Sequence, residues 1–290
     1  MSLTAHLRNT QSPVRLWMDR TFDKQACCEF VTEINNVLAT RVPVTTIGSI
    51  PGLAGTAFDY AARWTTGSLT SEIVATVGAA MCASVFELPN APAVASAVID
   101  LGNSAPSLYI RSQCSIALAW FEQVARIGKI PAQLQLTLGT ESTAQHQATA
   151  LLRLTPEATV RDVEALAGSI PAVWNTDLHV ATQNPVFSGS ALVGGADADW
   201  ITGRTLWETK TSADTRPFGR EHLLQAFGYV LLDGDNMFSL DHVGWYYARH
   251  QWRACFPLDE LARRLIRHGN FISLRVSFWQ EALRCSHVGV

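Results

Sequence analysis

The hydrophobic pattern of residues 187–257 changes from strand-like to helix-like and back again. Short alternating runs predict strands, and a longer run with three-to-four spacing predicts a helix between them. A chain in which strands and helices alternate in this way folds as a mixed α/β structure rather than as an all-helical one. The expected elements are strands 190–201 and 205–211, a helix at 221–233, strands 243–249 and 252–256, and a helix at 258–268.

The first half of the chain has a helical pattern instead. Its apolar residues recur at helical spacing, and proline and glycine separate the segments. Thr155 is the expected N-cap of one helix, with Pro156 at its first position. The sequence therefore predicts a helical N-terminal region, residues 1–135, followed by an α/β core, residues 136–290, with a mixed central sheet flanked by helices. The helices expected before the core strands are 23–38, 71–86, 92–101, 107–127 and 155–166.

The composition indicates the class of protein, its compartment and the partners that it can have. The 290 residues are 48% hydrophobic, which excludes a disordered or fibrous protein. The six cysteines form no CxxC pair, which is typical of reduced thiols. The first 15 residues have no apolar segment typical of a signal peptide, and the longest uncharged apolar run, 73–86, is too short to span a membrane. A cytoplasmic protein without a membrane partner is expected. The helical region is expected to be an extension of the core or a module that binds a protein partner or a second copy of the chain.

The net charge of −3 predicts no general attraction to nucleic acid, so phosphate binding requires a local basic surface. Residues 243–290 contain seven arginines and only three acidic residues. Arg204, Arg216 and Arg220 lie around the first strand pair and the start of the following helix. These arginines predict a surface for a phosphate backbone, with Arg220 as a substrate-binding residue. A solvated helix face at 258–268 is the alternative explanation for the later cluster.

Acidic residues and a lysine occupy the first predicted hairpin. Side chains alternate along a strand, so Glu208 and Lys210 share one face, and Asp197 and Asp199 share a face of the other strand. A Gly203–Arg204 loop places Asp199 opposite Glu208, whereas a loop one residue earlier places Asp197 there. Both aspartates remain candidates.

Two neighbouring carboxylates beside an ammonium group suit a hard divalent cation. Mg²⁺ binds oxygen ligands and leaves several positions to water and to substrate phosphate. Lys210 can then orient a metal-bound water or stabilise charge in the transition state. Only three of the 22 basic residues of the chain are lysines. Because lysine is rare here, its position two residues after Glu208 supports a functional role.

These motifs resemble those of the PD-(D/E)XK nuclease superfamily, in particular its branch that includes RecB-like and phage-type exonucleases. In that branch an Asp-apolar-apolar strand precedes an acidic-x-Lys-Thr strand and a helix with Gln-x-x-x-Tyr. The corresponding segments are Asp199-Trp200-Ile201, Glu208-Thr209-Lys210-Thr211 and Gln225-Ala226-Phe227-Gly228-Tyr229. The resemblance covers about residues 190–256.

The resemblance implies a restriction-endonuclease-like core and specific roles at the site. Asp199, Glu208 and the carbonyl of Thr209 would bind Mg²⁺ or Mn²⁺, with Asp197 as the alternative ligand. Lys210 would be the catalytic lysine. Gln225 and Tyr229 lie one helical turn apart and would face the active site and the DNA.

The expected function is therefore metal-dependent hydrolysis of DNA phosphodiester bonds, in DNA processing, repair or defence. One alternative is an inactive or subunit-type protein of the nuclease fold that binds nucleic acid. A second is a nuclease directed at RNA, and a third is a helical scaffold in which the hairpin motif arises by chance.

Overall fold

A computed structural model describes residues 2–67, 69, 73–170, 174 and 181–287. The chain divides into two compact units, one formed by residues 1–43 with 180–290 and the other by residues 44–179. This division differs from the predicted boundary between residues 135 and 136. The first 43 residues pack with the sheet, and the helices at 144–168 belong to the helical unit.

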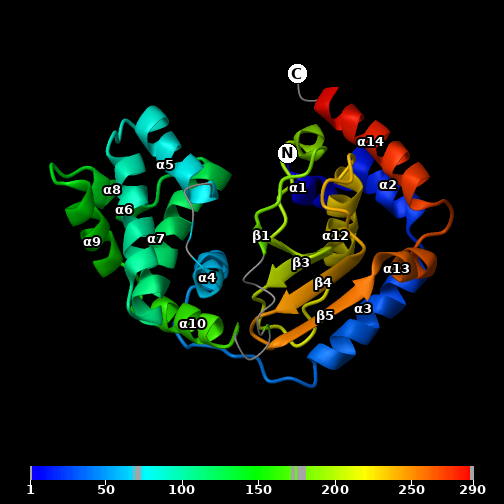
Figure 1. The fold of residues 1–290 in the computed structure, drawn as a ribbon, viewed down its shortest axis with the longest axis horizontal. Helices are drawn as coiled ribbons and strands as arrows, with labels where there is room; N and C mark the ends of the chain where they lie inside the picture. The colour runs from blue at the N-terminus through cyan, green and yellow to red at the C-terminus, as the bar shows by residue number, and fades with distance from the viewer. Residues whose placement is uncertain (1, 68, 70–72, 171–173, 175–180, 288–290) are drawn as a thin grey trace. The chain divides into compact units, whose positions relative to one another are not determined.

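The sheet unit contains a five-stranded mixed sheet in the order β1-β2-β3-β4-β5 (Figure 1). Strands β3 and β4 are parallel, and the other neighbouring pairs are antiparallel. A parallel pair requires a crossover, which helix α12 (Arg220–Leu232) provides between β3 and β4. The mixed α/β class predicted from the sequence is therefore confirmed. The strands are β1 (Thr182–Gln183), β2 (Trp200–Thr202), β3 (Thr205–Lys210), β4 (His242–Tyr247) and β5 (Trp252–Pro257).

The strand predicted for residues 190–201 is mostly wrong. Ser190–Val193 forms a short 3-10 helix, η2, and β2 begins only at Trp200. Gly194 and Gly195 have φ angles of 67° and 123°, which are incompatible with a continuous extended strand. Two consecutive glycines in positive φ separate the helical turn from the strand.

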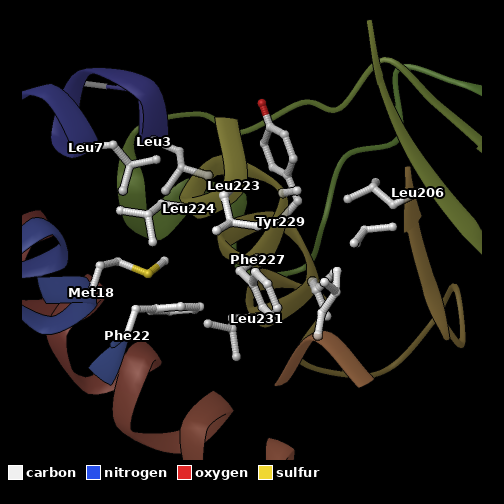
Figure 2. Close-up of a cluster of buried hydrophobic side chains, with 14 of the residues drawn as sticks. Leu3, Leu7, Met18, Phe22, Leu206, Leu223, Leu224, Phe227, Tyr229 and Leu231 are labelled. Carbon is white, nitrogen blue, oxygen red and sulfur yellow. The ribbon is translucent and has the colours of Figure 1, made fainter. Parts of the chain in front are cut away.

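Among the described residues of the sheet unit, six α-helices pack together, and one apolar core joins them to one face of the sheet. Figure 2 shows this core around α12, where Phe227 meets Phe22 at a ring-centroid distance of 5.0 Å. Leu206 reaches the same cluster from β3. Besides α12, these helices are α1 (Leu3–Arg8), α2 (Pro13–Thr21), α3 (Lys24–Leu38), α13 (Leu258–Leu265) and α14 (Phe271–His287).

The second unit is helical, and its core surrounds α7 (Leu108–Ile127). Gly78 allows α5 to approach α7 closely, because a Cβ at this position would lie 1.8 Å from the carbonyl oxygen of Phe121. No helix among the described residues has the length and apolar character required to cross a membrane. The other helices are α4 (Pro51–Thr66), α5 (Val74–Val85), α6 (Ala91–Ser104), α8 (Ala132–Leu138), α9 (Ala144–Arg153) and α10 (Glu157–Gly168).

The predicted N-cap at Thr155 is wrong by one residue. Pro156 occupies the N-cap position of α10, with ψ of 120°. The Thr155 hydroxyl instead donates to the carbonyl of Leu152, in the last turn of the preceding helix, at 2.6 Å.

Candidate active site

The register between β2 and β3 decides which aspartate faces Glu208. Trp200 pairs with Trp207, so Gly203–Arg204 is the two-residue loop. Continuing this register by one residue places Asp199, directly before β2, opposite Glu208. Of the two registers compatible with the sequence, the structure has the one that brings Asp199 to the site.

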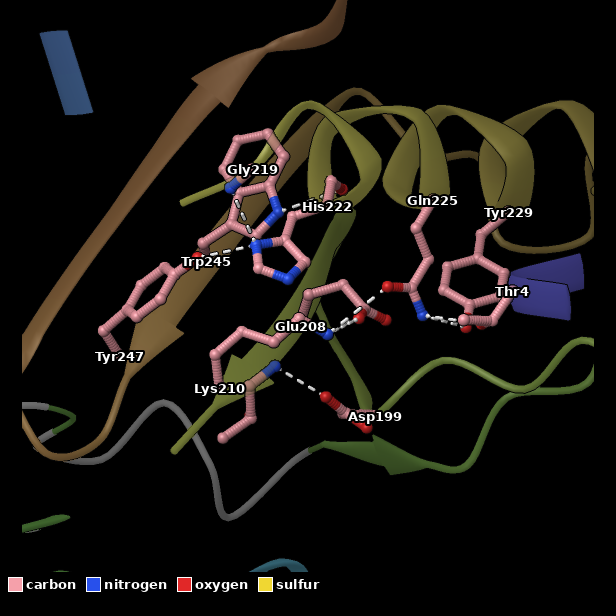
Figure 3. Close-up of polar contacts among 11 residues, drawn as sticks. Thr4, Asp199, Glu208, Lys210, Gly219, His222, Gln225, Tyr229, Trp245 and Tyr247 are labelled. Atoms are coloured by element: carbon pink, nitrogen blue, oxygen red, sulfur yellow. Dashed lines mark hydrogen bonds and ion pairs between the residues drawn. The ribbon is translucent and has the colours of Figure 1, made fainter. Parts of the chain in front are cut away.

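Asp199 is held against the backbone of β3 (Figure 3). Its Oδ2 accepts a hydrogen bond from the Thr209 amide at 2.5 Å. In a strand, the backbone amide and carbonyl of one residue point toward the same neighbouring strand. Those of the next residue point toward the strand on the other side. The Lys210 carbonyl accepts from Ala248, beyond β4, at 2.9 Å. The Thr209 carbonyl is therefore directed toward the side on which Asp199 lies.

Glu208 and Lys210 share the face of β3 that is turned toward α12. The Glu208 residue is only 1% exposed, and the Nζ of Lys210 lies 2.7 Å from its Oε2. The same Nζ lies 3.4 Å from the Oε1 of Gln225. Gln225 Nε2 in turn donates to the Tyr229 hydroxyl at 2.8 Å. The predicted Glu-x-Lys and Gln-x-x-x-Tyr motifs therefore meet in one hydrogen-bonded chain.

The carboxylates set the ionisation of their neighbours. Burial lowers the pKa of Lys210, but the charges of Glu208 and Asp199 outweigh this effect and leave the pKa raised. Lys210 is thus an ammonium group in the protein. Burial and the charge of Glu208 raise the pKa of Tyr229 well above its usual value, so its hydroxyl stays protonated.

This arrangement provides oxygen ligands for a small divalent cation. Asp199, directly before β2, and Glu208 of β3 supply the carboxylates, and the Thr209 carbonyl points to the side of β3 on which Asp199 lies. Among the described residues, no group of three or more His, Cys, Asp or Glu side chains is placed to hold a metal. A cation here would depend on two carboxylates and a carbonyl, with water and substrate completing its shell, as Mg²⁺ commonly does. The alternative ligand, Asp197, lies two residues before Asp199 in an isolated bridge with Val186.

A cavity of about 430 Å³ opens beside Lys210. Two arginines of the N-terminal helices, Arg8 and Arg15, contribute positive charge to its wall. Arg15 is fixed by hydrogen bonds to the carbonyl of Leu7 at 2.7 Å and to Asp19 at 2.8 Å. The residues that line the cavity are Thr4, Leu7, Arg8, Arg15, Lys210, Glu221, His222 and Gln225.

Known proteins offer no guide to this site. The chain matches no protein-family model, no curated protein and no solved structure. Its function is therefore inferred from the residues and geometry of the site.

The predicted basic surface is partly neutralised. Arg220 bonds to Asp19 of α2 and is absent from the described lining of the cavity. On α13, Arg264 pairs with Glu33 of α3. In the described lining of the cavity, the arginines are Arg8 and Arg15, which belong to none of the sequence motifs.

His222 also borders the cavity and is held in one tautomer. Its Nδ1 accepts from the amide of Gly219 at 3.2 Å, and the Tyr247 hydroxyl lies 2.9 Å from the same atom. Because an amide can only donate, the ring proton of neutral His222 is on Nε2. Burial, followed by the charge of Lys210, lowers the pKa of His222 to about 4.

This lowered pKa predicts a pH dependence of stability. The unfolded chain takes up a proton at His222 below its usual pKa of about 6.5, whereas the folded chain does not. The free energy of unfolding should therefore fall by about 2 kcal/mol through this group between about pH 7 and pH 5. Urea denaturation of the native protein and of His222→Gln measures it, and the native protein should lose more stability over this interval. Equal losses would contradict the assignment.

Proposed function

We propose that the chain is a metal-dependent nuclease that hydrolyses phosphodiester bonds of DNA. The observation that carries this proposal is the juxtaposition of Asp199 and Glu208 across β2 and β3, with the Lys210 Nζ 2.7 Å from Glu208. Asp199, Glu208 and the Thr209 carbonyl would bind Mg²⁺ or Mn²⁺. The strand-strand-helix-strand order from β2 to β4 supports a restriction-endonuclease-like core.

Each polar residue has a definite role in this proposal. When bound, the cation would supply an activated water and neutralise charge on the phosphate. Because Lys210 is protonated, it acts as a cationic donor that orients the nucleophile and stabilises the negative charge of the transition state. Gln225 holds the Lys210 ammonium on one side and the Tyr229 hydroxyl on the other. This chain of contacts fixes the lysine beside the cavity.

The charge of the cavity wall supports a polyanionic substrate. Arg8 lines the cavity beside Arg15 and Lys210, which pair with Asp19 and Glu208, and Glu221 is the acidic residue of the described lining. Cations beside Asp199 and Glu208 attract the phosphate backbone of a substrate toward the proposed metal site. The resemblance to exonucleases of the RecB-like branch makes DNA the proposed substrate.

Cleavage of labelled linear, circular and single-stranded DNA with Mg²⁺ or Mn²⁺ tests this function, with EDTA as the metal-free reference. Glu208→Gln should reduce the cleavage rate at least about a hundredfold, because it removes a ligand charge and the partner of Lys210. Cleavage of circular DNA would identify an endonuclease. DNA binding without cleavage by the native protein would favour the binding-only alternative, and cleavage of an RNA probe alone would favour the RNA-directed one.

A further inference from the structure

His222 lies one helical turn before Gln225 on α12. Residues three positions apart share a face of a helix, so His222 lies on the side that carries the polar chain to Lys210. Both His222 and Lys210 line the same cavity. The ring is therefore adjacent to the proposed cleavage site, although it belongs to none of the motifs selected from the sequence.

The orientation of this ring is fixed by the residues behind it. Gly219 and Tyr247 both contact Nδ1, and Phe218 packs edge-on against the ring with centroids 5.9 Å apart. Figure 3 shows the second ring nitrogen, Nε2, on the side where Glu208 and Lys210 lie. Within the described residues, no hydrogen bond is formed to Nε2. A rigid N–H donor thus faces the cavity.

The surroundings of this donor favour an anionic acceptor. Lys210 and Arg8 are the nearby cations that, together with burial, keep the ring neutral, and Glu221 contributes the opposing charge. A neutral imidazole is a weak acid near neutral pH, which favours hydrogen bonding over proton transfer. An oxygen of a substrate phosphate would accept from Nε2–H and pair with the neighbouring cations.

We propose that His222 is a substrate-binding residue that donates its Nε2–H to a non-bridging oxygen of a backbone phosphate in the cavity beside Lys210. The proposal rests on the nuclease function and adds an uncharged hydrogen-bond donor to the residues that would bind the substrate phosphate. Gly219 is the positioning residue that selects the tautomer, and Tyr247 helps to orient the ring.

Two amide substitutions separate the donor from the structural role of the ring. Asparagine is short and its oxygen can replace Nδ1 as the acceptor for Gly219, but it leaves no donor in the cavity. Glutamine is longer and its amide N–H can approach the position of Nε2. We expect His222→Asn to reduce kcat/KM about tenfold, as loss of one hydrogen bond to a charged group predicts, and His222→Gln to retain most activity.

The salt dependence of binding distinguishes this contact from a cationic one. Binding of a short fluorescent DNA duplex is measured with Ca²⁺ in place of Mg²⁺, over a range of salt concentrations. His222→Asn should weaken binding by the same factor at every concentration, because a neutral donor releases no counterion. Arg8→Gln should instead reduce the slope of log K against log salt by about 0.9.

The outcomes for His222 and for the nuclease function are separable. Unchanged binding and kcat/KM in His222→Asn, with native cleavage intact, would overturn the role of His222 alone. Equal losses in the asparagine and glutamine variants would show that the ring is structural, which also overturns it. A native protein that neither binds nor cleaves nucleic acid would overturn the nuclease function and this contact with it.

Discussion

Replacing Lys210 by methionine should reduce the rate of metal-dependent DNA cleavage by about a hundredfold to a thousandfold. Methionine keeps most of the length of the side chain but removes the ammonium group 2.7 Å from Glu208. The loss should be in kcat, since the charge acts mainly on the transition state. Single-turnover cleavage of labelled duplex DNA with Mg²⁺ measures it.

The chain provides a matched control for this substitution. Lys129 is exposed two residues after the end of α7 in the helical unit, and Lys129→Met removes the same charge from the molecule. This variant should cleave at the native rate. Equal activity of the Lys210 and Lys129 variants would remove Lys210 from the proposed mechanism.

Phe30→Ala should lower the free energy of unfolding by about 3–5 kcal/mol. Phe30 is 1% exposed on α3, and its ring lies 5.1 Å from Phe256 of β5 and 6.0 Å from Phe218, centroid to centroid. Alanine would leave a cavity between the N-terminal helix and the sheet. Equilibrium denaturation in urea measures the change.

Val37 provides the control on the same helix. Val37 is 43% exposed, and Val37→Ala should change the free energy of unfolding by less than about 0.5 kcal/mol. A cost below about 1 kcal/mol for Phe30→Ala would contradict the assignment of residues 1–43 to the sheet unit. It would favour the predicted division, in which the whole N-terminal region lies outside the core.

Local patterns were sufficient to predict much of the sheet unit. The helix at 220–232 and strands β3, β4 and β5 lie within one or two residues of the segments expected from hydrophobic spacing. The prediction of a strand at 190–201 was wrong because Gly194 and Gly195 adopt positive φ angles. The alternation of apolar and polar residues does not reveal these angles. Helix α14 was missed, although its buried residues Leu274, Phe278 and Ala282 recur every four positions.

The candidate site was predictable only in part. Glu208, Lys210, Gln225 and Tyr229 are close in the chain, so their spacing was enough to group them. Helix α1, which carries Arg8, meets α12 through contacts about 220 residues apart in sequence, such as that between Thr4 and Gln225. No local pattern encodes such packing, and His222 acquires its role from the orientation that Gly219 and Tyr247 impose.

Mn²⁺ binding, measured by electron paramagnetic resonance, tests most directly whether Asp199 and Glu208 form a cation site. Asp199→Asn retains an oxygen for the Thr209 amide but loses the charge, and Glu260→Gln removes a charge from an exposed position on α13. Native protein and Glu260→Gln should bind Mn²⁺ equally, whereas Asp199→Asn and Glu208→Gln should bind it at least about tenfold more weakly. Mn²⁺ binding that is unchanged by both site substitutions would contradict the proposed metal centre.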